Sequence, residues 1–176
     1  MQLGFDPEKL VFIDETGAKS NMTRRYGRTL RGVRLVDHTP HGHWVNSCYV
    51  CAIRKGGITA QTVFEGAMNK VRFDEYVRDV LCPTLRKGDI VVWDNLPAHR
   101  SIVARKWVEA TGATLLPLPS YSPDLNPIEM SFLKLILRKE KIRDVGKLHK
   151  FLLASGKLFS SIECENYFRK AGYGLN

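Results

Sequence analysis

The sequence has 176 residues, of which 44% are hydrophobic and 26% charged. These values are typical of one folded globular domain and exclude a collagen-like or disordered chain. Lysine and arginine number 27 against 18 acidic residues, and the resulting charge of +9 favours a polyanionic partner such as nucleic acid. A basic surface without such a partner is the alternative.

The chain carries no membrane or export signal that the sequence reveals. No apolar run approaches the roughly 20 residues that cross a bilayer, and the N-terminus lacks the basic and apolar segments of a signal peptide. The four cysteines are few enough to indicate reduced thiols. We therefore expect a cytoplasmic protein that has no membrane partner.

Apolar runs and turn signals predict three strands, followed by strands that alternate with helices. A polar and basic stretch over residues 18–43 is expected to be a loop with a short strand. Strands are predicted at residues 10–13, 44–54, 58–65, 89–93 and 113–118. Helices are predicted at residues 70–81, 101–110, 127–140, 144–155 and 161–170. This order predicts an α/β fold, a mixed sheet with helices on its faces.

Cys48 and Cys51 have the spacing of a zinc-binding pair, and three histidines lie just upstream of them. Two observations weaken that interpretation. No second pair of this spacing follows, and both cysteines fall in a predicted strand, where residues three apart point to opposite faces.

Three acidic residues are candidates for metal-dependent chemistry. Asp14 and Asp94 each follow a short apolar run, and Glu129 lies in the first turn of a predicted helix. In α/β folds, ligand-binding and active sites lie at the ends of the buried strands. Carboxylates that converge there repel each other unless cations separate them. Hard cations such as Mg²⁺ meet that need. The structural alternative is that Asp14 and Asp94 begin turns and that Glu129 complements a helix dipole.

The segments around these acids resemble the three signature blocks of mariner-superfamily DDE transposases, most closely those of bacterial insertion sequences. The blocks are VFIDET (11–16), VVWDNLPAH (91–99) and LPSYSPDLNPIE (118–129). Asp94 and Glu129 are separated by 34 residues (129 − 94 − 1), a spacing typical of that superfamily. The segments NMTRRYGR (21–28) and ECENYFRKAGY (163–173) also resemble the family, so the likeness covers nearly the whole chain.

The resemblance implies an RNase H-like mixed sheet flanked by helices, with Asp14, Asp94 and Glu129 as a catalytic, metal-binding triad. It implies two divalent ions, Mg²⁺ or Mn²⁺, which cleave DNA at transposon ends and transfer the freed strand to target DNA. A homodimer on DNA and a bacterial, nucleoid-associated location follow from the same resemblance. The alternatives are a metal-dependent endonuclease without strand transfer and a non-catalytic DNA-binding remnant.

Neighbouring residues in these blocks have less certain roles. Glu15 and Asn95 are candidates to support the metal ligands from behind, although Glu15 is equally compatible with a turn and Asn95 with a DNA contact. His99 is a candidate phosphate contact, or else makes a local structural hydrogen bond. Asp124 is expected to form a turn.

Basic residues on both sides of the triad are candidate phosphate contacts, and we expect about half of them to touch DNA. They are Arg24, Arg25, Arg28, Arg31, Arg34, Lys134, Arg138, Lys139, Lys141 and Arg143.

The domain expectation is a single catalytic domain over residues 1–176, without an N-terminal helix-turn-helix region. Only 13 residues precede Asp14, and no helix-turn-helix pattern is found in the sequence. Recognition of transposon ends would then come from a separate helix-turn-helix polypeptide or from sequence upstream.

Overall fold

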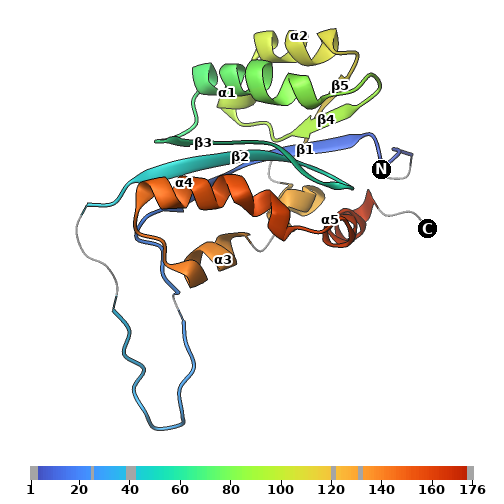
Figure 1. The fold of residues 1–176 in the computed structure, drawn as a ribbon. Coiled ribbons are helices and arrows are strands. Elements are labelled where there is room, and N and C mark those ends of the chain that lie inside the picture. The colour runs from blue at the N-terminus through green and yellow to red at the C-terminus, as the bar shows by residue number, and fades with distance from the viewer. Residues whose placement is uncertain (1–3, 25, 39–42, 120–121, 131–132, 174–176) are drawn as a thin grey trace.

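A computed structural model describes residues 4–24, 26–38, 43–119, 122–130 and 133–173 (Figure 1). Its centre is a five-stranded sheet in the order β3-β2-β1-β4-β5. The strands are β1 (Leu10–Lys19), β2 (Asn46–Arg54), β3 (Gly57–Glu65), β4 (Ile90–Trp93) and β5 (Thr114–Pro117). The first three strands pair antiparallel, whereas β4 pairs parallel with both β1 and β5. The predicted mixed sheet is confirmed.

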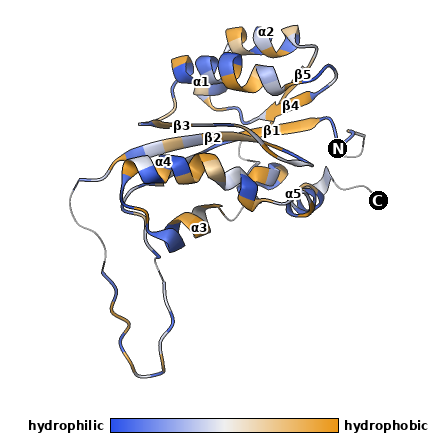
Figure 2. Cartoon of the chain, in the orientation of Figure 1, coloured by the Kyte–Doolittle hydropathy of each residue, from blue (hydrophilic) through white to orange (hydrophobic). Residues whose placement is uncertain are grey.

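Helices cover both faces of the sheet (Figure 1). One face carries α1 (Lys70–Tyr76) and α2 (Ile102–Ala110), and the other carries α3 (Leu133–Glu140), α4 (Val145–Ala154) and α5 (Ser161–Phe168). The helices mix hydrophobic and hydrophilic residues (Figure 2), and the buried apolar residues of α1, α2, α4 and α5 belong to the two cores that also contain sheet residues. The α/β class follows because each helix buries only one apolar stripe and needs a sheet face to cover it.

Alternate side chains along β1 point to opposite faces of the sheet and belong to two separate hydrophobic cores. Leu10 and Phe12 belong to the core under α4 and α5, whereas Val11 and Ile13 belong to the core under α1 and α2. All four side chains are at most 3% exposed. Since successive strand residues point to opposite faces, the two cores require an unbroken apolar run here, as the sequence has.

The strand β1 is longer than the sequence predicts. It pairs with β2 as far as Lys19 opposite Asn46, whereas its pairing with β4 covers only Leu10 to Phe12. Asp14 therefore lies inside a strand rather than at its end. The polar residues after Ile13 stay extended because β2 supplies hydrogen bonds that apolar patterning alone does not reveal.

The predicted continuous helix over residues 127–140 is wrong. Pro127–Met130 form a 3₁₀ turn, and α3 begins at Leu133. Asn126 does cap this turn, since its Oδ1 accepts a hydrogen bond from the Ile128 backbone at 3.2 Å. The helix at residues 70–81 is also shorter than expected, because α1 ends at Tyr76 and a π-helical turn continues to Leu81.

Residues 20–45 form a long connection between β1 and β2, here called the arm, which projects from the body (Figure 1). Its described residues contain no strand, so the short strand expected there is not found among them. Arg143 holds the base of the arm by donating to the carbonyl oxygens of Ser20 and Met22, both at 2.9 Å. Lys141 pairs with Asp37 further along the arm at 3.1 Å.

Cys48 and Cys51 are buried on opposite faces of β2, each in a different core. Burial raises the pKa of each thiol to about 12. This arrangement agrees with the strand interpretation and not with a zinc-binding pair. Among the described helices, none has the length and apolar character to cross a membrane.

Candidate catalytic centre

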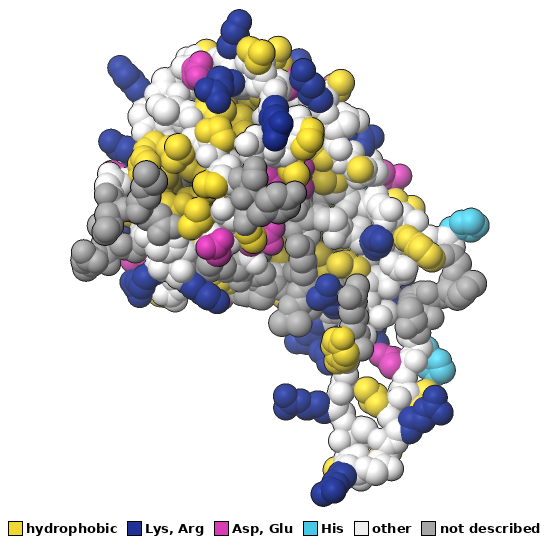
Figure 3. Space-filling view, turned by 180° about the vertical axis from the view of Figure 1, so that it is seen from behind, with side chains coloured by type: hydrophobic (Ala, Val, Ile, Leu, Met, Phe, Trp, Pro, Cys, Tyr) yellow, Lys and Arg dark blue, Asp and Glu magenta, His cyan; other side chains and the backbone are white. Residues whose placement is uncertain are grey.

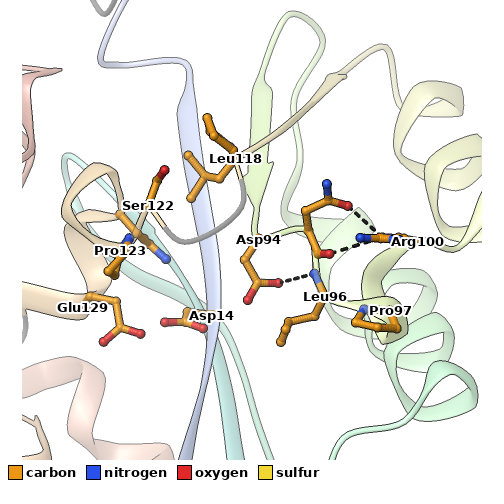
Figure 4. A pocket seen from close by; sticks show the side chains of 12 residues that line it. Asp14, Asp94, Leu96, Pro97, Arg100, Leu118, Ser122, Pro123 and Glu129 are labelled. Atoms are coloured by element: carbon orange, nitrogen blue, oxygen red, sulfur yellow. Dashed lines mark hydrogen bonds between the residues drawn. The ribbon is translucent and has the colours of Figure 1, made fainter.

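The fold brings Asp14, Asp94 and Glu129 to one cavity of about 430 Å³ (Figure 4). Phe12 of β1 pairs with Val92 of β4, so Asp14 and Asp94 each follow this last pair by two residues on adjacent parallel strands. Glu129 comes from the 3₁₀ turn after Asn126, which lines the same cavity. The strand that contains Asp14 therefore lies beside the strand that ends just before Asp94.

Asp14 and Glu129 point toward each other across the cavity (Figure 4). Burial raises the pKa of Asp14, and the hydrogen bond and negative charge of Glu129 raise it further, to about 8. The Glu15 backbone N–H opposes this shift by donating to Asp14 Oδ1 at 2.7 Å. Two carboxylates this close share a proton unless a cation takes its place.

Asp94 is held from the opposite side of the cavity. Its Oδ1 accepts hydrogen bonds from the Leu96 backbone N–H at 3.2 Å and from Nδ1 of His99. The carboxylate is 36% exposed, whereas the His99 ring is only 3% exposed. Asp94 thus has one side against the protein and one side open to the cavity.

His99 lies between two carboxylates. Its Nε2 is 3.0 Å from Oε1 of Glu15, and its ring lies 4.2 Å from the Phe73 ring centroid. Burial lowers the pKa of His99, but the hydrogen bonds with Asp94 and Glu15 outweigh it and raise the pKa to about 9. The sequence suggested a phosphate contact, yet here both ring nitrogens face carboxylates.

Asn95 is exposed, and Arg100 binds both its side chain and its backbone. Its Oδ1 accepts a hydrogen bond from Arg100 Nε at 3.0 Å, and its backbone carbonyl accepts from the same nitrogen at 3.2 Å. Of the two residues predicted to support the metal ligands, Glu15 therefore reaches Asp94 through His99, while Asn95 fixes the loop that follows β4. No local pattern in the sequence pointed to the contact between His99 and Asp94, which depends on a short turn that returns the ring to the carboxylate five residues earlier.

The acidic cavity fits a hard divalent cation. It offers three carboxylates from separate elements, and the pKa of Asp14 is raised by burial first and then by the hydrogen bond and negative charge of Glu129. Oxygen donors of this kind are the usual ligands of Mg²⁺ and Mn²⁺. Within the described residues, no three His, Cys, Asp or Glu side chains already stand close enough to form a ready-made metal cage.

The candidate phosphate contacts lie away from this acidic centre. Arg24 and Arg28 are exposed on the arm, where lysine and arginine side chains stand out (Figure 3). Arg138 is half-buried in α3. Arg25 and the side chain of Lys134 lie outside the described residues.

Comparison with known proteins gives the same architecture. The chain has a TM-score of 0.74 to a Mos1 mariner paired-end complex with Mn, at 18% identity, covering 95% of this chain and 52% of that chain. The Mos1 catalytic domain gives a TM-score of 0.65 at 16% identity, covering 94% of this chain and 76% of that one. A mixed sheet of this topology, flanked by helices on both faces, has the RNase H-like fold.

The sequence comparisons identify the family. Residues 9–149 match the family described as DDE superfamily endonuclease, and the chain belongs to it. The chain is also 39% identical over 57 residues to the Tc1 transposase of Caenorhabditis elegans. The aligned segment covers 32% of this chain and 21% of that protein. It therefore spans about a fifth of Tc1 transposase and about half of the Mos1 chain in the paired-end complex.

Proposed function

We propose that this chain is the catalytic domain of a transposase that cleaves DNA at transposon ends and transfers the freed strand to target DNA. The observation that carries the proposal is the convergence of Asp14, Asp94 and Glu129 on one cavity in a DDE-family fold. A cavity that is open, acidic and set in a chain of charge +9 suits a DNA backbone drawn to a bound cation.

We propose that these three acids hold two Mg²⁺ or Mn²⁺ ions. Mos1 structures described with Mn and with Mg support this choice. Two such ions, when bound, activate a water or 3′-hydroxyl and stabilise the leaving oxygen. The contribution of the chain is to position carboxylates: Asp14 in β1, Asp94 directly after β4 and Glu129 in the turn before α3. No side-chain nucleophile is needed for this chemistry.

The proposed partners are transposon-end DNA, target DNA and a second copy of the chain. The Mos1 paired-end complexes support the first and third of these. Arg24, Arg28 and Arg138 are proposed phosphate contacts, which add affinity without reading sequence. End recognition is assigned to a helix-turn-helix region or to a separate helix-turn-helix polypeptide. We propose a bacterial origin and a place beside the nucleoid, where such DNA lies.

A joining assay tests the proposal without knowledge of the transposon ends. A short labelled duplex with a free 3′-hydroxyl is incubated with supercoiled plasmid, the purified chain and either Mg²⁺ or Mn²⁺. Transfer of label to the plasmid supports the transposase. Plasmid nicking without transfer supports the alternative endonuclease. Binding of both DNAs without either product would support the non-catalytic remnant.

Asp94→Asn is the matched control, because it removes one anionic ligand while keeping nearly the same shape. We expect this variant to bind DNA normally and to lose at least about 100-fold of the joining rate, the lower end of what a metal-dependent step supplies. An unchanged joining rate in Asp94→Asn would show that Asp94 is not part of the catalytic site.

A further inference from the structure

Glu15, His99 and Asp94 form a continuous hydrogen-bonded row beside the cavity. His99 occupies the middle, with Nδ1 against Oδ1 of Asp94 and Nε2 at 3.0 Å from Oε1 of Glu15. Exposure falls to 3% at the His99 side chain, against 14% at Glu15 and 36% at Asp94. The row therefore runs from the half-buried Glu15 on β1, through the buried His99 ring, to a carboxylate at the cavity.

The row joins the two strands that carry the proposed metal ligands. Asp14 and Glu15 are neighbours on β1 and so point to opposite faces of the sheet. Asp14 faces Glu129 on one side (Figure 4), while Glu15 faces His99 on the side of α1. Of these two consecutive acids, Asp14 thus lines the cavity, and Glu15 supports Asp94 through His99.

Packing leaves the His99 ring little room to rotate. The ring lies 4.2 Å from the Phe73 ring centroid with an interplanar angle of 32°, and Phe73 meets Trp93 edge-on at 5.1 Å. Phe73 is fully buried and Trp93 is 2% exposed. A ring fixed in this way holds the direction of its two nitrogens, and with it the direction of the bond to Asp94.

The contacts also distinguish the two oxygens of Asp94. The hydrogen bonds from Leu96 and His99 both fall on Oδ1. A carboxylate held by one oxygen presents the other in a fixed direction, here toward the cavity that Asp94 lines. Supporting bonds of this kind set the affinity of metal sites because they remove the cost of ordering a ligand.

We propose that His99 and Glu15 are positioning residues, which fix Asp94 so that its Oδ2 faces the divalent-ion site. The inference rests on the proposed role of Asp94 as a metal ligand. Neither residue touches the ion in this arrangement, and His99 contributes to the site only through Asp94. This role replaces the phosphate contact that the sequence suggested for His99.

Two variants of His99 separate the two hydrogen bonds. In His99→Asn the amide nitrogen takes the place of Nδ1 and keeps the bond to Asp94, while the bond to Glu15 is lost. In His99→Gln the amide nitrogen takes the place of Nε2 and keeps the bond to Glu15, while the bond to Asp94 is lost. Both variants remove the buried ring, so each controls for the loss of packing in the other.

The readouts are Mn²⁺ affinity, measured by calorimetric titration of the chain without DNA, and thermal unfolding in EDTA. We expect His99→Gln to weaken Mn²⁺ binding roughly 10–100-fold and His99→Asn to stay close to the wild type. Similar melting temperatures of the two variants in EDTA would show that packing does not cause the difference. Equal losses of affinity in both variants, or none in His99→Gln, would overturn the inference.

Two further variants complete the design. Glu15→Ala, at a more exposed position, is expected to weaken Mn²⁺ binding less than His99→Gln, and unchanged affinity would remove Glu15 from the support. Asp94→Asn tests the proposed function separately. If Asp94→Asn binds Mn²⁺ like the wild type, Asp94 is not a ligand. If it loses Mn²⁺ while His99→Gln keeps it, only the positioning role fails.

Discussion

Replacing Asp14 by asparagine should stabilise the metal-free protein at alkaline pH. The pKa of Asp14 is about 8 in the folded chain, against an ordinary value of 3.8, because burial and Glu129 disfavour its ionised form. The folded state therefore holds a proton that the unfolded state has released. This contribution to stability is complete below pH 3.8 and is lost as the pH rises to about 8. The amide introduced by Asp14→Asn keeps a donor toward Glu129 without adding charge.

The size of the effect follows from the shift. Raising the pKa of Asp14 from 3.8 to about 8 corresponds to roughly 6 kcal/mol, at about 1.4 kcal/mol for each tenfold change in the proton affinity. Because the shift belongs to an interacting pair and not to Asp14 alone, we expect about half of this, on the order of 3 kcal/mol, from a change at Asp14. The gain should be close to zero at pH 4 and reach its full value above pH 8.

Urea unfolding in EDTA and reductant at pH 4, 6 and 9 measures the gain directly, because the midpoint shifts with the free energy of unfolding. Asp124→Asn, at an exposed position in the neighbouring 3₁₀ turn, is the matched control and should change little at any pH. A variant Asp14→Asn no more stable than the wild type at pH 9, or equally stabilised at pH 4 and pH 9, would refute the account of the acidic pair.

Three other predictions concern separate parts of the chain. Arg54→Ala should lower the free energy of unfolding by about 3 kcal/mol in urea, because it leaves the buried Asp89, 2.6 Å away, without its cation. Ser160→Ala should cost about 1 kcal/mol in the same assay, since it breaks the capping box with Glu163 at the start of α5. Arg28→Ala should weaken DNA binding on all sequences alike and reduce the slope of log K against log salt by about 1, measured by fluorescence anisotropy; an unchanged slope would remove Arg28 from the interface.

The sheet was predictable because its strands carry strong local signals. The apolar runs before Asp14 and Asp94 are buried on both faces, and such runs identify central strands without knowledge of their partners. The length of β1 was not predictable. Its second half is polar and is held extended by pairing with β2, a contact between residues far apart in the sequence.

In the candidate site, too, some residues could be placed from the sequence and one could not. The positions of Asp14, Asp94 and Glu129 follow from spacing and family resemblance, since each lies in a distinctive block. The place of His99 depends on a 3₁₀ turn, Pro97–His99, that returns the ring toward Asp94, and on its packing against Phe73. Neither feature has a local pattern. The sequence therefore left two roles open for His99, a phosphate contact and a local structural hydrogen bond.

The net charge is likewise a poor count of DNA contacts, because some basic residues are used within the fold. Arg143 donates to two backbone carbonyls at the base of the arm, and Lys141 pairs with Asp37 at 3.1 Å. Both cations were candidate phosphate contacts. The Lys141 pair is exposed and weak, so a phosphate can compete for it, whereas the two carbonyls bound by Arg143 would be left without their donor. Arg143 is thus better explained as the residue that fixes where the arm leaves the body, and the exposed arginines further along the arm, such as Arg24 and Arg28, remain the ones available to DNA.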